Sequence, residues 1–89
     1  MSMLSLNVGT LAKLCFDDVY INYISKYNLY PDHMIDNFIK YNEKIGVIVS
    51  YGVQQNLNLF KGLEEVEVYL VYMGDITLSV DAKYVTGVK

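Results

Sequence analysis

Apolar and polar residues alternate at the start of the chain and then take up a helical spacing. Residues 3–8 alternate, which is the period of a half-buried strand. Thr10 is a suitable helix cap, and apolar side chains recur three and four positions apart after it. The pattern predicts a strand over 3–8 and a helix over about 11–28. Leu11 and Leu14 lie outside the apolar stripe of this helix, so its continuity stays open.

A proline marks the start of a second helix. Pro31 stands where its missing N–H costs no hydrogen bond, because N–H groups in the first turn of a helix have no partner within the helix. Beyond it, apolar residues share one side of a helical wheel and charged residues take the other. The apolar side consists of Met34, Ile35, Phe38, Ile39 and Tyr41. This spacing predicts a helix over about 32–44.

Alternation returns after Lys44. It predicts a strand over 45–53, a turn at 54–56 and a short strand over 57–61. The turn is placed on the run Gln-Gln-Asn, which interrupts the β-rich residues on either side.

The strongest local pattern is a hairpin near the end of the printed sequence. Two β-rich runs, 66–73 and 76–84, flank a Gly-Asp dipeptide, which is typical of a two-residue turn. Such a turn pairs Met73 with Ile76 and thereby assigns each side chain to a face. The face expected in the core holds Tyr69, Val71, Met73, Ile76, Leu78, Val80 and Ala82. On the other face lies an apolar set that we name the hairpin column: Val66, Val68, Leu70 and Tyr72.

These elements predict one α+β domain spanning 1–89, since 89 residues leave no room for two. We expect two helices packed on one face of a mainly antiparallel sheet of four to five strands, in the order β-α-α-β-β-β-β. If the helices cover only that face, the hairpin column is left for water or a partner, and Ile48 would enlarge it. The predicted partner-binding residues are Val66, Val68, Leu70, Tyr72 and Ile48.

Composition narrows the classes of partner. The chain is 53% hydrophobic and 19% charged, which is far from the composition of disordered proteins. Its seven cations are all lysines, set against ten carboxylates, and the net charge is −3. Without the arginine fork that grips phosphate, we expect no binding to nucleic acid or to anionic membranes. No uncharged stretch reaches the roughly 18 residues that a membrane helix needs, and no basic leader precedes an apolar run. We expect a cytoplasmic protein, of a bacterium or of a virus's host cell.

Few residues are available for chemistry. The one histidine, His33, and the one cysteine, Cys15, are 18 positions apart, and no serine stands in a strained turn motif. A nucleophile needs an adjacent base, and zinc needs several close ligands. Glycines are dispersed and form no phosphate-binding loop. We therefore predict a non-enzymatic protein with no cofactor and no metal.

Tyrosine is abundant, with nine residues. Tyrosine is enriched at protein interfaces because it joins a large apolar ring to a polar tip, but AT-rich coding also raises its frequency. Both interpretations stay open. We expect four tyrosines in the core (Tyr20, Tyr23, Tyr27 and Tyr69) and five freer to contact a partner (Tyr30, Tyr41, Tyr51, Tyr72 and Tyr84).

The sequence therefore favours a protein-binding module that self-associates as a homodimer or larger homo-oligomer. A small regulator or inhibitor encoded by a virus, a phage or a mobile element matches the acidic, arginine-free composition. The alternative is a protein that binds a nucleotide or metabolite in a tyrosine-lined pocket or at a dimer seam.

Overall fold

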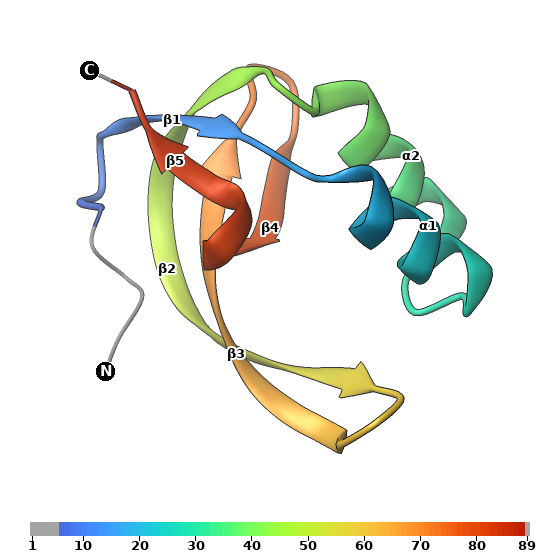
Figure 1. The fold of residues 1–89 in the computed structure, drawn as a ribbon. Coiled ribbons are helices and arrows are strands. Elements are labelled where there is room, and N and C mark those ends of the chain that lie inside the picture. Colours follow the sequence, from blue (N-terminus) through green and yellow to red (C-terminus); the bar gives the residue numbers. More distant parts are fainter. Residues whose placement is uncertain (1–5, 89) are drawn as a thin grey trace.

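Two helices are inserted between the first and second strands of a five-stranded antiparallel sheet (Figure 1). The structure is a computed structural model that describes residues 6–88. In chain order the elements are β1 (Leu11–Leu14), α1 (Asp18–Lys26), α2 (Asp32–Tyr41), β2 (Ile45–Asn58), β3 (Gly62–Tyr72), β4 (Thr77–Asp81), the 3₁₀ helix η1 (Ala82–Tyr84) and β5 (Val85–Gly87). The strands lie side by side in the order β4-β3-β2-β1-β5. The predicted α+β class and the order of helices and strands are confirmed.

The sheet is strongly curved, and α1 and α2 lie on its concave side (Figure 1). One apolar core joins the helices to the sheet, because Ile24, Ile35 and Phe38 belong to the same buried cluster as residues of every strand. Neither α1 nor α2 is long and apolar enough to cross a membrane, and no other α-helix occurs in residues 6–88.

The β3–β4 hairpin has the predicted register. The Met73 N–H donates a 2.8 Å hydrogen bond to the Ile76 carbonyl, and Val71 pairs with Leu78. Val71 has none of its surface exposed and Leu78 only 4%, so the face of the hairpin that the sequence predicts to be buried does lie in the core. Gly74 takes φ +104°, which a residue without Cβ adopts at little cost.

The predicted helix over 11–28 is wrong in its first third. Leu11–Leu14 forms β1, and α1 begins at Asp18 with Asp17 as its cap, whose carboxylate accepts a 2.6 Å hydrogen bond from the Tyr20 N–H. The physical reason is burial in the sheet. Strand β1 pairs with β2 on one side and with β5 on the other. Its side chains at alternate positions, Ala12 and Leu14, are completely buried, and only a strand places alternate residues on one face. Of the strand predicted over 3–8, residues 3–5 lie outside the described residues, and 6–8 form a bend and a turn.

The turn predicted at 54–56 is also wrong, since β2 continues to Asn58 and β3 begins at Gly62. Two of the three polar side chains that suggested a turn, those of Gln54 and Asn56, are hydrogen-bonded within the sheet. Gln54 donates to the Asn56 side-chain oxygen at 2.8 Å and accepts from the Ser79 hydroxyl at 2.8 Å. Residues 53–58 and 62–67 pair with each other and with no third strand among the described residues. We name this two-stranded extension the β2–β3 arm.

The second run of the predicted hairpin, 76–84, is interrupted. Strand β4 ends at Asp81, whose carboxylate accepts a 3.1 Å hydrogen bond from the Lys83 N–H and so caps η1. The chain then continues into β5 on the far edge of the sheet, beside β1. Helix α2 ends at Tyr41, three residues earlier than predicted, and Glu43 takes φ +65°.

Candidate functional site

The hairpin column is less exposed than the sequence predicts. Ile48 pairs with Val71 on the core face and is completely buried, so its assignment to this surface is wrong. Val68 is 5% exposed, Val66 and Leu70 are half-buried, and Tyr72 is 44% exposed. Of the five predicted partner-binding residues, only Tyr72 presents a largely open side chain. Whether the column binds a partner stays a prediction.

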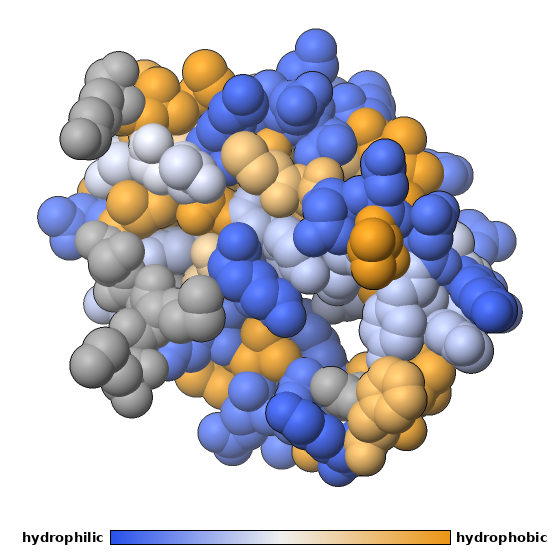
Figure 2. All heavy atoms as spheres, in the orientation of Figure 1, coloured by the Kyte–Doolittle hydropathy of each residue, from blue (hydrophilic) through white to orange (hydrophobic). Residues whose placement is uncertain are grey.

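A cavity of about 540 Å³ lies between α1 with the loop after it and the strands that face them. It is visible as an opening near the middle of the surface in Figure 2, above the β2–β3 arm. The residues that line it are Asp17, Val19, Tyr20, Tyr23, Ile24, Leu29, Tyr30, Gln55, Asn56, Leu57, Glu64, Val66, Asp81, Lys83 and Tyr84. We name this cavity the tyrosine cleft, after Tyr20, Tyr23, Tyr30 and Tyr84. Val66 is the one member of the hairpin column that lines it.

Three tyrosines of the cleft are positioned by ring contacts with their neighbours. The rings of Phe16, Tyr20 and Tyr84 form a triangle, in which the Tyr20 centroid is 6.1 Å from Phe16 and 4.2 Å from Tyr84, and Phe16 is 5.6 Å from Tyr84. The Tyr30 ring meets buried Phe38 edge to face, with centroids 5.5 Å apart. Pairs at these distances gain roughly 0.5–1.5 kcal/mol beyond the area that they bury. The wall of the cleft is therefore anchored to the core.

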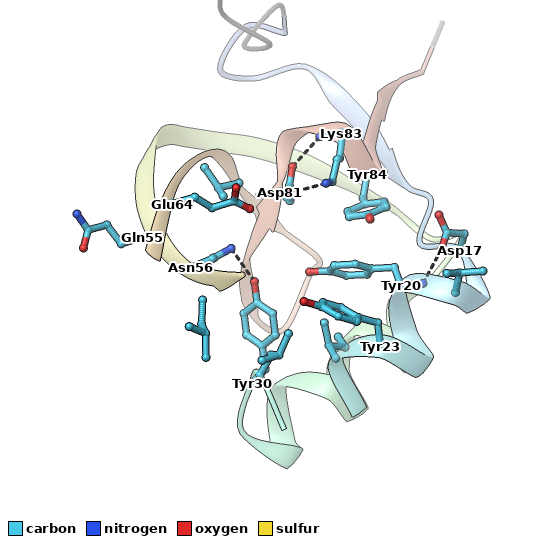
Figure 3. A pocket seen from close by; sticks show the side chains of 15 residues that line it. Asp17, Tyr20, Tyr23, Tyr30, Gln55, Asn56, Glu64, Asp81, Lys83 and Tyr84 are labelled. Carbon is cyan, nitrogen blue, oxygen red and sulfur yellow. Dashed lines mark hydrogen bonds and ion pairs between the residues drawn. The ribbon is translucent and has the colours of Figure 1, made fainter. Parts of the chain in front are cut away.

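The hydroxyl groups of Tyr20, Tyr23 and Tyr30 point from the helical side toward the strands (Figure 3). Two of these hydroxyls accept hydrogen bonds from β2 and the turn after it. The Asn56 amide donates to the Tyr30 oxygen at 3.0 Å, and the Leu59 N–H donates to the Tyr23 oxygen at 3.4 Å. These bonds hold the β2–β3 arm across the cleft, so the cleft depends on the arm for its second wall.

Carboxylates outnumber ammonium groups around the cleft. Asp17, Glu64 and Asp81 line it, against Lys83 alone. The Lys83 ammonium lies 3.8 Å from the Asp81 carboxylate and 5.5 Å from the centre of the Tyr84 ring. The cleft therefore carries more negative than positive charge.

Two phenols of the cleft, those of Tyr20 and Tyr84, have raised pKa values. Burial, followed by the negative charges of Asp17 and Asp81, raises the pKa of Tyr84 to about 12. Burial is also the main cause that raises the pKa of Tyr20, with smaller contributions from Tyr30 and Tyr84. Both phenols are neutral at physiological pH and keep their protons for hydrogen bonding.

The tyrosines are distributed differently from the expectation. Tyr69 is in the core as predicted, but Tyr27 is 47% exposed and Tyr41, expected to be freer, is 8% exposed. Tyr51 and Tyr72 are exposed, as expected. The cleft was missed as a constellation because nothing in the spacing relates Tyr84 to Tyr20, although Tyr20 and Tyr23 lie three positions apart on one helix face.

The two nucleophilic or titratable candidates of the sequence lie apart from this cavity. Cys15 and His33 are both exposed, and neither lines the cleft. Within residues 6–88, no three side chains of histidine, cysteine, aspartate or glutamate are grouped so as to hold a metal ion. The cleft can offer stacking surfaces, phenolic hydroxyls and negative charge, which are means of binding.

No protein-family model, curated protein or solved structure matches the chain.

Proposed function

We propose that the protein is a non-enzymatic protein-binding module and that a segment of its partner binds in the tyrosine cleft. The tyrosine cleft is the observation that supports this proposal. Four rings line one cavity, and aromatic side chains that combine an apolar ring with a hydroxyl are the residues enriched at binding surfaces. The hydroxyls contribute polar contacts that fix the orientation of a bound chain.

Pre-organisation also supports the cleft as the binding surface. Three of its four rings contact Phe16 or Phe38, and both phenylalanines are almost fully buried. A wall that is already ordered loses little conformational freedom when a ligand binds, so more of the contact energy contributes to affinity. The hairpin column offers less, because only Tyr72 is substantially exposed there.

A substitution at the rim of the cleft tests the proposal. Val19 lines the cleft and is 79% exposed, so Val19→Arg places a long side chain at the entrance without disturbing the core. Ile39→Arg makes the same change in charge at a 55% exposed position of α2 outside the cleft. Peptides selected on the wild-type protein from a library of random linear peptides should lose binding to Val19→Arg and keep it with Ile39→Arg. Equal binding to both variants would place the site elsewhere and would overturn the proposal.

Small-molecule binding is the second candidate, and the size of the cleft favours it. A volume of about 540 Å³ lies within the range of roughly 300–1,000 Å³ that is usual for ligand pockets. The excess of carboxylates disfavours phosphates, so nucleotides are poor occupants and neutral or cationic metabolites are better ones. A thermal-shift panel separates the two functions, because a ligand at 100 times its Kd adds about 2.7 kcal/mol of stability. A saturable shift with a metabolite, absent in Val19→Arg, would favour this second candidate.

Self-association through the hairpin column remains part of the proposal, as does action as a regulator or inhibitor. Tyr72 is the residue to change, since its side chain is the most exposed of the column. If the protein assembles through this surface, Tyr72→Asp shifts its molecular mass in solution toward that of the monomer. An unchanged mass with an unchanged circular dichroism spectrum would exclude the column as an assembly surface.

A further inference from the structure

We infer that the tyrosine cleft recognises a cationic side chain, lysine or arginine, carried by the segment of the partner protein. This inference rests on the proposed function and adds the chemistry of the ligand to it. It follows from the combination of aromatic rings, phenolic oxygens and carboxylates around one cavity (Figure 3).

The carboxylates provide the charge. Asp17 and Asp81 lie on either side of Tyr84 (Figure 3), and both charges act on its phenol. The Asp81 side chain is 11% exposed, so its charge is only partly screened by water. The one ammonium of the lining, on Lys83, is 55% exposed and can turn outward when a second cation arrives.

The rings provide the second attraction. A cation over the face of an aromatic ring is attracted by the negative charge density of that face. The Tyr84 ring of the cleft already makes such a contact with the protein's own Lys83, whose ammonium is 55% exposed and lies 5.5 Å from the centre of the ring. A ring that lines the cleft is therefore accessible to an ammonium or guanidinium group.

The phenolic oxygens complete the site. The hydroxyls of Tyr20, Tyr23 and Tyr30 point into the cavity (Figure 3). The oxygens of Tyr23 and Tyr30 each accept one hydrogen bond already, from β2 or the turn after it, and a hydroxyl oxygen has a second lone pair that can accept another from a charged donor. Lysine brings three N–H donors and arginine five, so both match a lining rich in acceptors. A phosphate or carboxylate ligand would be repelled by the carboxylates of Asp17, Glu64 and Asp81.

The test separates charge recognition from folding and from general electrostatics. Asp17→Asn and Asp81→Asn remove charge but keep a side-chain oxygen that can accept the capping hydrogen bonds from Tyr20 and Lys83. The double variant Asp17→Asn/Asp81→Asn is compared with Asp18→Asn/Asp36→Asn, which removes two carboxylates outside the cleft. Circular dichroism establishes that both double variants are folded.

Peptides selected on the wild-type protein from the library of random linear peptides are then sequenced and titrated. We expect lysine or arginine at one fixed position of the selected peptides. We also expect the cleft double variant to bind them roughly five- to thirtyfold more weakly, and the control variant to bind as the wild type does. Replacing the fixed basic residue by glutamine should lower the affinity for the wild-type protein and have little further effect on the cleft variant.

The other possible outcomes contradict either this inference alone or the proposed function as well. Selected peptides that lose binding to Val19→Arg but show no basic position would overturn this inference and leave the proposed function standing. Peptides that bind Val19→Arg as well as they bind the wild type would overturn both. Spermidine or lysine amide that binds as tightly as the peptides would show that the cleft takes a free amine rather than a protein segment.

Discussion

The Tyr41 hydroxyl donates a 2.5 Å hydrogen bond to the Asp75 carboxylate and so joins the end of α2 to the turn between β3 and β4. These residues are 34 positions apart, so the bond links segments that are distant in the chain. The sequence predicts Tyr41 to be among the tyrosines freer to contact a partner, whereas the structure buries its ring against the core.

Removing this bond should destabilise the protein. Tyr41→Phe keeps the ring in the core and removes only the hydroxyl, so the variant should unfold at a lower temperature than the wild type. Tyr51→Phe, at a 57% exposed position, is the control and should leave the melting temperature unchanged. Equal melting temperatures for the two variants would show that the bond adds nothing to stability.

The same bond predicts a dependence of stability on pH. The hydrogen bond from Tyr41 is the main cause that lowers the pKa of Asp75 below its usual value of 3.8. A group with a lowered pKa in the folded state stabilises the protein above its unfolded pKa, and this contribution is lost as the pH falls through the folded pKa. The stability difference between the wild type and Asp75→Asn should therefore be constant above about pH 5 and shrink in more acidic solution. Urea unfolding at a series of pH values measures it, and a difference that does not change with pH would contradict the assignment.

The raised pKa of Tyr84 predicts that the protein loses stability as the pH rises in alkaline solution. Its pKa is raised to about 12, so its contribution to stability is complete below the unfolded pKa of 10.0 and is lost as the pH rises toward the folded value. Stability of the wild type should fall between about pH 10 and pH 12 more steeply than that of Tyr84→Phe, which has no phenol to ionise at this position. Chemical unfolding across this range, followed by circular dichroism, tests the difference. Parallel pH profiles would mean that the Tyr84 phenol titrates equally in both states.

Two glycines of β2 should respond differently to the same substitution. A Cβ at Gly46 would lie 2.5 Å from the Met73 sulfur and 2.6 Å from the Tyr72 carbonyl oxygen, whereas one at Gly52 meets nothing within 4 Å. Overpacking of this kind costs roughly 1–3 kcal/mol, so Gly46→Ala should lower the free energy of unfolding by that amount. Gly52→Ala should leave it within about 0.5 kcal/mol of the wild type. Similar losses of unfolding free energy in both variants would show that the cost comes from strand propensity and not from the close approach at Gly46.

The bond between Tyr30 and Asn56 should keep the β2–β3 arm closed over the cleft. Tyr30→Phe removes it while keeping the ring against Phe38, at an expected cost of about 0.5–1.5 kcal/mol. Hydrogen exchange should become faster for amides of residues 53–58 and 62–67, and stay the same in β4. In Asn56→Ala the added substitution Tyr30→Phe should have little effect, because the bond is already lost. Unchanged exchange in Tyr30→Phe would mean that the arm is held by other contacts.

Local patterns in the sequence predicted the elements whose signals are complete within a few residues. The two-residue turn defines the register of β3 and β4, and Pro31 precedes the first residue of α2. The misplaced elements depend on distant partners. Leu11–Leu14 became a strand because β2 and β5 lie on either side of it, and β5 is more than 70 positions later in the chain.

The face of β2 could not be predicted for a related reason. Alternation over 45–53 identifies a strand, but its larger apolar residues at odd positions are mostly exposed, while Gly46 and Ile48 are buried. The irregularity in pairing between Ile48 and Ser50 and the pairing of Ile48 with Val71 decide which side faces the core. A bulge is set by tertiary contacts, so the period of the sequence does not reveal it.

The walls of the tyrosine cleft come from three separate stretches of chain, within 17–30, 55–66 and 81–84. None of these stretches encloses the cavity alone, and the last begins at the end of β4, which pairs with β3. A ligand of the cleft therefore binds the completed native state and has no matching site on a partly folded chain. By mass action such a ligand shifts the population of the whole domain toward the native form. Any ligand that binds the cleft should therefore also slow proteolysis of the chain, because it lowers the population of the unfolded form that proteases cut.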